Sequence, residues 1–197
     1  MPKGIALTQE ALTKRRREIF NAAANIFLKQ GFQETSIGEI AEAAGIGRST
    51  LYDYFKNKDD ILVFFVEEEV SELTRRTEEI FLQSIDVIEK LHQTMLIHLE
   101  FLAQNKELYL RLMMETMQLS LESQQRIQVR RYAYQDLLRS IIEQGVQQGV
   151  FRPVDPLLVA RLLINSIIPV VYASRPTRTP KEMLEETIDT FLKGIQA

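Results

Sequence analysis

Apolar residues recur along this chain at the three- and four-residue spacing of amphipathic helices, and no stretch alternates in the way that a strand requires. The first expected helix covers residues 13–30, and Gly31 after it suits a left-handed residue at the helix end. That turn would let Phe32 fold back against Phe27. The pattern predicts an all-α fold.

Two short helices follow, joined by a glycine-rich turn. Ser36 and Glu39 have the spacing of a capping box that opens the first of them, which ends at Gly45. The second is expected over residues 48–55, with an apolar side facing the preceding helices and a polar side facing away. This is the helix-turn-helix pattern, in which the second helix enters the major groove of DNA.

Six longer helices are expected after this pattern. Three of them are expected to span residues 84–103, 105–121 and 123–148. The other three are expected to begin at residues 57–60, 155–156 and 179–180. The last two begin where a capping residue precedes a proline, and Pro169 should kink or end the first of these two. The chain thus predicts about nine helices, three in a small N-terminal unit and the others in a larger bundle.

Composition excludes several classes of function. The chain has no cysteine, which excludes disulfides, thiol catalysis and thiolate metal sites, and it has only two histidines, His92 and His98. Glu89 and His92 have the Glu-x-x-His spacing of di-iron bundle proteins, but the second such pair is missing. We therefore expect no metal, no cofactor and no enzymatic activity.

Neither a signal peptide nor a membrane span is expected. Residues 1–9 contain no apolar run of useful length, and the longest apolar runs elsewhere, residues 61–66 and 167–173, are too short to cross a bilayer. We expect a cytoplasmic protein with no membrane partner.

The net charge of −3 is unevenly distributed along the chain. Residues 1–60 carry nine Lys or Arg and eight acidic residues, whereas the remainder carries fifteen and nineteen. Residues 14–17 form a compact basic cluster at the start of the first helix. Such a cluster could lie beside DNA phosphates or be a solvated helix start, and charge alone favours neither.

The helix-turn-helix residues also carry a family resemblance. Residues 35–37 (Thr-Ser-Ile), 40–46 (Ile-Ala-Glu-Ala-Ala-Gly-Ile) and 50–62 (Thr-Leu-Tyr-Asp-Tyr-Phe-Lys-Asn-Lys-Asp-Asp-Ile-Leu) are similar to the pattern of TetR-type repressors. The resemblance implies a DNA-binding domain at residues 1–58 and a ligand-binding and dimerisation domain at residues 59–197. It implies a ligand-responsive repressor that binds a palindromic double-stranded DNA operator as a homodimer and is released by a small, largely apolar effector.

Eight residues would contact DNA by this resemblance. Four would contact the sugar-phosphate backbone, namely Thr50, Tyr52, Tyr54 and Lys58. Ser36 or Ile37 would place the start of the first short helix against a phosphate, where the helix dipole helps. Arg48 and Ser49 would read bases, and Arg48 suits a guanine O6/N7 pair.

Several motif residues leave alternatives open. Tyr52 could equally be a half-buried packing residue. Gly38 stands where some family members carry a base-reading side chain, and Gly47 replaces the usual Ser-type cap. Asp53 lies in the middle of the outward side, where it would repel phosphates unless it accepts a hydrogen bond from a cytosine or pairs with a nearby cation.

The larger domain would enclose an effector pocket, by the same resemblance. Its expected lining is Phe65, Met95, His98, Leu102, Tyr109, Met113, Met117 and Tyr134. Met-rich and aromatic walls adapt to apolar ligands, although each such residue could equally be ordinary core. Arg111 and His98 are the candidates for a polar group of the ligand.

The last two helices carry broad apolar stripes for which one chain offers little cover. By resemblance they would pair with their copies in a four-helix interface. Its expected residues are Leu158, Arg161, Asn165, Ile168, Ile188, Phe191 and Leu192. The alternative is a monomer that covers these stripes with its own helices.

A function of another class stays open beside the repressor. The acidic residues of the motif, Gly38 and the near-neutral N-terminal unit also fit a helical interaction module whose degenerate helix-turn-helix does not bind DNA.

Overall fold

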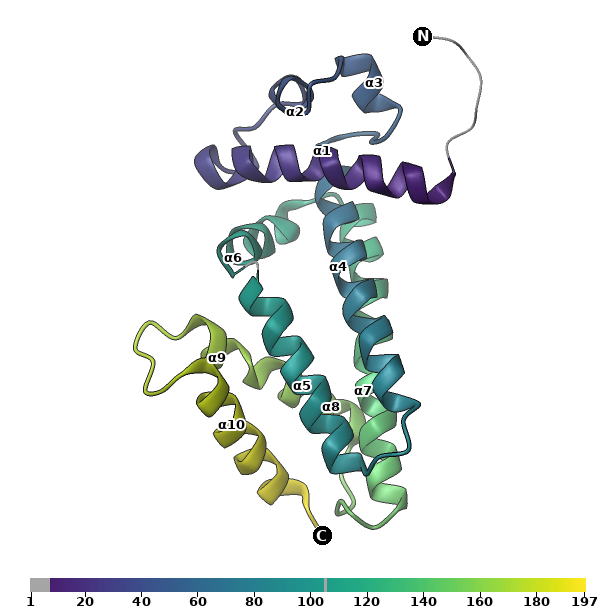
Figure 1. Ribbon diagram of the computed structural model, residues 1–197, viewed down its shortest axis with the longest axis vertical. Coiled ribbons are helices and arrows are strands. Elements are labelled where there is room, and N and C mark those ends of the chain that lie inside the picture. The colour runs from purple at the N-terminus through teal and green to yellow at the C-terminus, as the bar shows by residue number, and fades with distance from the viewer. Residues whose placement is uncertain (1–7, 105) are drawn as a thin grey trace. The chain divides into compact units, whose positions relative to one another are not determined.

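The computed structural model describes residues 8–104 and 106–197, and it confirms the expected all-α fold (Figure 1). The elements run in the order α1 (Gln9–Gln30), α2 (Ile37–Ala43), α3 (Arg48–Tyr52), α4 (Lys58–Phe81), α5 (Val87–Gln104), α6 (Lys106–Glu115), the 3₁₀-helix η1 (Thr116–Gln118), α7 (Leu121–Gln147), α8 (Pro156–Ser166), α9 (Ile168–Tyr172) and α10 (Pro180–Ile195). The described residues contain no strand, only an isolated bridge between Phe151 and Gln196.

Side-chain caps set the helix starts that the sequence predicts. Ser36 and Glu39 form a complete capping box at α2, and Thr179 and Glu182 form another at α10. Asp155 accepts hydrogen bonds from two backbone N–H groups of the first turn of α8. These caps satisfy N–H groups that have no partner within the helix.

Two helix ends differ from the expectation, and one agrees with it. The second short helix, α3, ends at Tyr52 and not near Phe55, and the chain continues in a turn in which Phe55 N–H still bonds to the Leu51 carbonyl. The helix expected over residues 105–121 is α6 followed by η1, and its expected first residue, 105, lies outside the described residues. Pro169 does interrupt its helix: α8 ends at Ser166, and a separate short helix follows.

The chain forms two compact units. The first comprises the residues up to Glu68 together with Glu107–Ile127, and the second comprises Glu69–Lys106 with Gln128–Ala197. Helices α4 and α7 each contribute residues to both units.

Aromatic packing builds the core of the first unit. The rings of Phe20 and Phe65 stack with centroids 4.3 Å apart. Phe27 and Phe32 meet edge to face at 5.2 Å, as the turn at Gly31 predicts, and Gly31 has φ of +89°. These contacts join α1 to α4 and to the turn that follows α1.

In the second unit, α10 packs against α5 and α9, and α5 also contacts α9 (Figure 1). Its core includes Leu91, Met95, Leu138 and Ile141, all at most 1% exposed. No helix among the described residues is both long and apolar enough to cross a membrane.

Candidate functional site

The helix-turn-helix is held from its inner side. Leu51 of α3 is fully buried, and Ile40 and Ala41 of α2 are buried with it. Gly45 between the two helices has φ of +64°, a left-handed conformation that glycine adopts without steric cost. The opposite side of α3 is therefore fixed in orientation and free of core contacts.

Most of the expected DNA contacts lie on that outer side or at its border. Arg48 and Ser49 are exposed, Tyr52 is 55% exposed and Thr50 is half-buried. Tyr52 is thus not a core residue. Tyr54 is half-buried and lies beyond the end of α3, in the turn that follows it.

Ser36 is committed to the cap of α2. Its hydroxyl donates to a carboxylate oxygen of Glu39 at 2.7 Å and accepts from the Glu39 N–H at 3.3 Å. The backbone and side-chain hydrogen bonds from Ser36 lower the pKa of the Glu39 carboxyl. Ile37, which follows it, is half-buried.

Lys58 is bound to the protein itself. Its ammonium donates to the carbonyl oxygens of Phe32 at 2.6 Å and Gln33 at 2.8 Å, and it lies 4.6 Å from the centre of the Phe32 ring. Burial lowers the pKa of this ammonium. A lysine in the first turn of α4 is unfavourable beside the positive end of the helix dipole. The two carbonyl oxygens compensate for this, so the position of Lys58 requires no phosphate.

The basic cluster at residues 14–17 is mostly engaged within the first unit. The engaged pairs are Arg15 with Glu18 at 2.6 Å, Arg17 with Glu68 at 3.1 Å, and Arg16 with the rings of Phe55 and Phe64 at 4.7 and 4.4 Å. Lys14 is exposed. Three of these four cations thus already contact side chains of the protein, through two exposed ion pairs and a contact with two aromatic rings.

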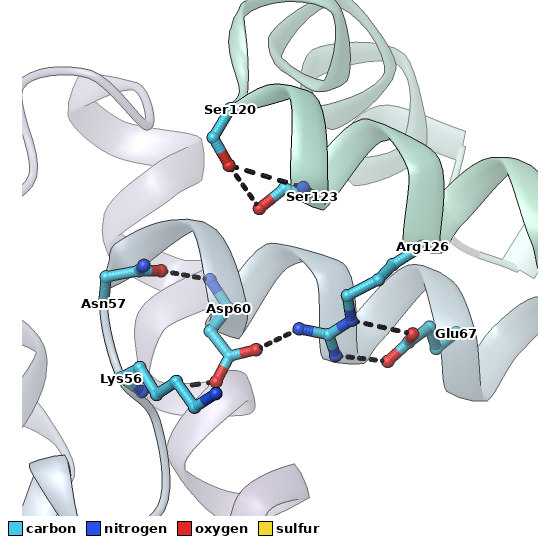
Figure 2. Close-up of polar contacts among 7 residues, drawn as sticks. All are labelled: Lys56, Asn57, Asp60, Glu67, Ser120, Ser123 and Arg126. Atoms are coloured by element: carbon cyan, nitrogen blue, oxygen red, sulfur yellow. Dashed lines mark hydrogen bonds and ion pairs between the residues drawn. The ribbon is translucent and has the colours of Figure 1, made fainter.

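A cluster that the sequence did not reveal ties α4 to α7 within the first unit (Figure 2). The guanidinium of Arg126 binds both carboxylate oxygens of Glu67, at 2.8 and 3.2 Å, and a carboxylate oxygen of Asp60 at 2.6 Å. The hydrogen bonds that Arg126 donates to Glu67 and Asp60 raise its pKa. We call these three residues the Arg126 cluster.

Asp60 also fixes the backbone just after α3. Its second carboxylate oxygen accepts the Lys56 N–H at 3.2 Å, and its own N–H donates to Asn57 at 2.8 Å (Figure 2). One carboxylate therefore holds both the segment that leaves α3 and a guanidinium from α7. The sequence offered one signal, because Asp60 and Glu67 are seven residues apart and so share a helix face.

The expected pocket residues of the second unit form a buried group around a polar pair. Met95, His98, Leu102 and Tyr134 are all buried, and His98 Nδ1 lies 3.1 Å from the Tyr134 hydroxyl. Burial lowers the pKa of His98 to about 4 and raises that of Tyr134, so both are neutral at pH 7. Thr94 is also buried, and its hydroxyl has no hydrogen-bond partner among the described residues.

The expected pocket residues of the first unit are less uniform. Phe65 is buried in its stack with Phe20, and Tyr109 and Met113 are half-buried. Met117 is 76% exposed. Its side chain therefore lines no enclosed cavity in this structure.

The expected dimer residues divide between two faces. Leu158, Arg161, Asn165 and Ile168 are exposed, with Leu158 at 52% and Ile168 at 42%, and Phe191 and Leu192 are half-buried. Ile188 is only 4% exposed, so the expectation that it lacks cover within the chain is wrong. It lies on the side of α10 that packs into the second unit.

An open groove of about 510 Å³ adjoins these exposed residues. Its lining includes Pro169, Val170, Met183 and Phe191, from α9 and α10. Apolar surface is thus available on the outer side of these helices.

The Glu-x-x-His spacing on α5 has a simple explanation. His92 Nε2 lies 2.7 Å from a carboxylate oxygen of Glu185 on α10. Glu89 accepts a hydrogen bond from Gln93 at 2.7 Å. The two residues therefore have different partners and do not converge on one point.

Known proteins match the chain along most of its length. The family model described as "Bacterial regulatory proteins, tetR family" matches residues 19–63, and that described as "Tetracyclin repressor-like, C-terminal domain" matches residues 84–195. The fatty acid metabolism regulator protein of Bacillus subtilis (strain 168) is 30% identical over 151 residues, which are 77% of this chain and 78% of that protein. The repressor KstR2 of Mycobacterium tuberculosis is 26% identical over 190 residues, 93% of this chain and 94% of its own length.

A solved structure supports the same assignment. The transcriptional regulator FadR from Bacillus subtilis, in complex with stearoyl-CoA, is similar with a TM-score of 0.79 and 26% identity over 91% of this chain and 99% of its own. Such relatives regulate transcription, which agrees with the expectation that this chain is not an enzyme. The resemblance in the helix-turn-helix is thereby confirmed, and the chain belongs to the TetR family of bacterial regulatory proteins.

Proposed function

We propose that this protein represses transcription by binding a palindromic operator as a homodimer, and that a small, largely apolar effector releases it. The observation that carries the proposal is the outer side of α3, where Arg48, Ser49 and Tyr52 are exposed on a helix anchored by Leu51. A helix fixed in this way and polar on its free side fits the major groove. Because an operator-binding protein must reach the bacterial DNA, we expect this protein in the cytoplasm.

Within this proposal, the residues of α3 and of the turn after it divide between bases and phosphates. Arg48 and Ser49 at the start of α3 would reach base edges, and Thr50, Tyr52 and Tyr54 would contact the sugar-phosphate backbone. At the start of α2, Ser36 or Ile37 would offer a backbone N–H to a phosphate, since the Ser36 hydroxyl serves the cap.

Lys58 has a different place in the proposal. Because its ammonium already binds two carbonyls between α1 and α2, its main effect on DNA would be to hold that segment in place. Any contact with phosphate would use what donor capacity remains.

Dimerisation would use the outer sides of α8 and α10 with α9. The exposed side chains of Leu158 and Ile168 and the groove that Phe191 lines supply apolar surface. A twofold interface there would present two α3 helices to successive turns of the duplex, roughly 34–36 Å apart.

The effector would bind in the second unit, beside the buried His98–Tyr134 pair. Apolar neighbours such as Met95 and Leu102 suit an acyl chain, and a neutral imidazole, a phenol and the unpartnered Thr94 hydroxyl can hydrogen-bond a carbonyl. The apolar part of the effector would then be an acyl chain, and the structure of the relative FadR with stearoyl-CoA supports a long-chain acyl thioester of coenzyme A as the first effector to test.

A gel shift against the DNA that flanks the protein's own gene tests the proposal. We expect one discrete complex, on the order of 10³-fold tighter than the complex with an unrelated duplex of equal length and base composition. Stearoyl-CoA should dissolve this complex, whereas free coenzyme A should not. Equal affinity for both duplexes would contradict operator recognition and favour the interaction module.

A further inference from the structure

Gly38 is a glycine for which the backbone of its helix gives no reason. It lies in the first turns of α2, where alanine is the better helix former. Its φ is not among the positive values, which belong to Gly31, Gly45 and Gly149. Some other requirement must account for the missing side chain.

The space beside Gly38 is occupied by Arg48. A Cβ atom built on Gly38 would lie 2.1 Å from Nη2 of Arg48 and 2.7 Å from both Cζ and Nε. The guanidinium from the start of α3 therefore lies directly against the Gly38 α-carbon. A side chain at position 38 and this placement of Arg48 exclude each other.

Gly47, the other glycine next to α3, differs in this respect. A Cβ there would meet only Ser49 Oγ at 3.8 Å and Thr50 Oγ1 at 3.9 Å, which are ordinary contacts. Its φ of −72° is open to any residue. Gly47 is thus a matched control for glycine substitution in the same motif.

We propose that Gly38 is a specificity-determining positioning residue, because its missing side chain leaves the space in which the Arg48 guanidinium lies and so decides which base Arg48 reads. This rests on the proposed function, in which Arg48 reads a base. The donors of arginine form a rigid fork, and their pairing with a guanine edge depends on orientation. Gly38 would set the preference of the operator without itself touching a base.

The substitution Gly38→Ala tests this with little risk to the fold. The three atoms nearest to the added methyl group all belong to the end of a flexible side chain, so Arg48 can move while α2 stays in place. Alanine also favours the helix, so the melting temperature should not fall. Gly38→Ser adds one more atom at the same place and should displace the guanidinium further.

Binding constants would be measured on operator duplexes carrying each of the four bases at every half-site position. The proteins are wild type, Gly38→Ala, Gly38→Ser, Arg48→Ala, the double variant Gly38→Ala/Arg48→Ala and Gly47→Ala. Arg48→Ala should relax the preference at one position of each half-site roughly tenfold or more, and Gly38→Ala should change the preference at that same position. In the Arg48→Ala background, Gly38→Ala should have no further effect, and Gly47→Ala should keep the wild-type preference.

Two results would overturn the inference about Gly38 and leave the proposed function intact. One is a Gly38→Ala variant with the wild-type base preference. The other is a Gly38→Ala effect that is still present in the Arg48→Ala background. A uniform loss of affinity in Arg48→Ala would show that Arg48 only touches phosphate, and the inference would fail while operator binding stands. A wild-type protein that prefers no sequence would overturn the proposed function together with the inference.

Discussion

Replacing Arg126 by methionine should destabilise the first unit, because it leaves two acidic groups of α4 without their cation. Methionine keeps the stem of the side chain but removes three hydrogen bonds, two to Glu67 and one to Asp60 (Figure 2). It also frees the carboxylate that holds the Lys56 N–H after α3.

The size of the effect follows from the exposure of the cluster. The side chains of Asp60 and Glu67 are 12% and 21% exposed and that of Arg126 is 37% exposed, so the pairs are neither buried nor fully solvated. Exposed pairs contribute at most about 1 kcal/mol, and breaking a buried pair costs roughly 3–5 kcal/mol. We expect about 2 kcal/mol after allowing for solvent screening of Arg126, or a fall in melting temperature of roughly 4–8 °C.

Urea unfolding followed by circular dichroism measures this loss. Wild type and variant are compared at the same protein concentration, because dimerisation would couple stability to concentration. Arg75→Met is the matched control: Arg75 also binds two glutamates, Glu72 and Glu79, but all three side chains are more than half exposed. Because solvent screens these exposed pairs, the loss of stability in Arg75→Met should be clearly smaller than that in Arg126→Met. An Arg126→Met variant no less stable than Arg75→Met would refute the reasoning.

Three further predictions concern other residues. The pKa of about 4 for His98 lies below its ordinary value of 6.5, so the unfolded chain takes up the proton first as pH falls. This contribution to the free energy of unfolding is complete above pH 6.5 and is lost toward pH 4, by about 3 kcal/mol in total. His98→Gln should remove most of this dependence on pH. The same dependence in wild type and variant, measured by urea unfolding at pH 7, 6 and 5, would contradict the prediction. Lys58→Met should lower the stability by roughly 1–3 kcal/mol and also weaken DNA binding, whereas Thr50→Ala should weaken only DNA binding. An unchanged melting curve for Lys58→Met would show that its two hydrogen bonds contribute little to stability. Ile168→Glu should convert a dimer to a monomer in sedimentation velocity, and a wild type that is already monomeric at micromolar concentration would contradict the dimer.

Local features of the fold were predictable from the sequence. The capping boxes at Ser36 and Thr179 and the break at Pro169 depend on residues close together in the chain, and all three are present. The same holds for the turn at Gly31. Local sequence fixes such features because the interacting atoms are only a few residues apart.

Contacts between distant segments were not predictable in the same way. Arg126 lies 66 residues from Asp60, and Lys58 lies 26 residues from Phe32, so only the packing of the helices decides that they meet. The burial of Ile188 follows from the same packing, since a broad apolar stripe does not tell which of its sides the chain itself covers. Charge counting left the role of residues 14–17 open, and it did not show that acidic and aromatic neighbours engage three of the four cations.

The stoichiometry of the operator complex tests the central claim most directly. Sedimentation velocity with a fluorescent operator duplex would give the mass of the complex, once for the full palindrome and once for a single half-site. A regulator that holds two half-sites as a homodimer should place two chains on the palindrome and bind the half-site at least tenfold more weakly. One chain per duplex, with equal affinity for palindrome and half-site, would contradict the account.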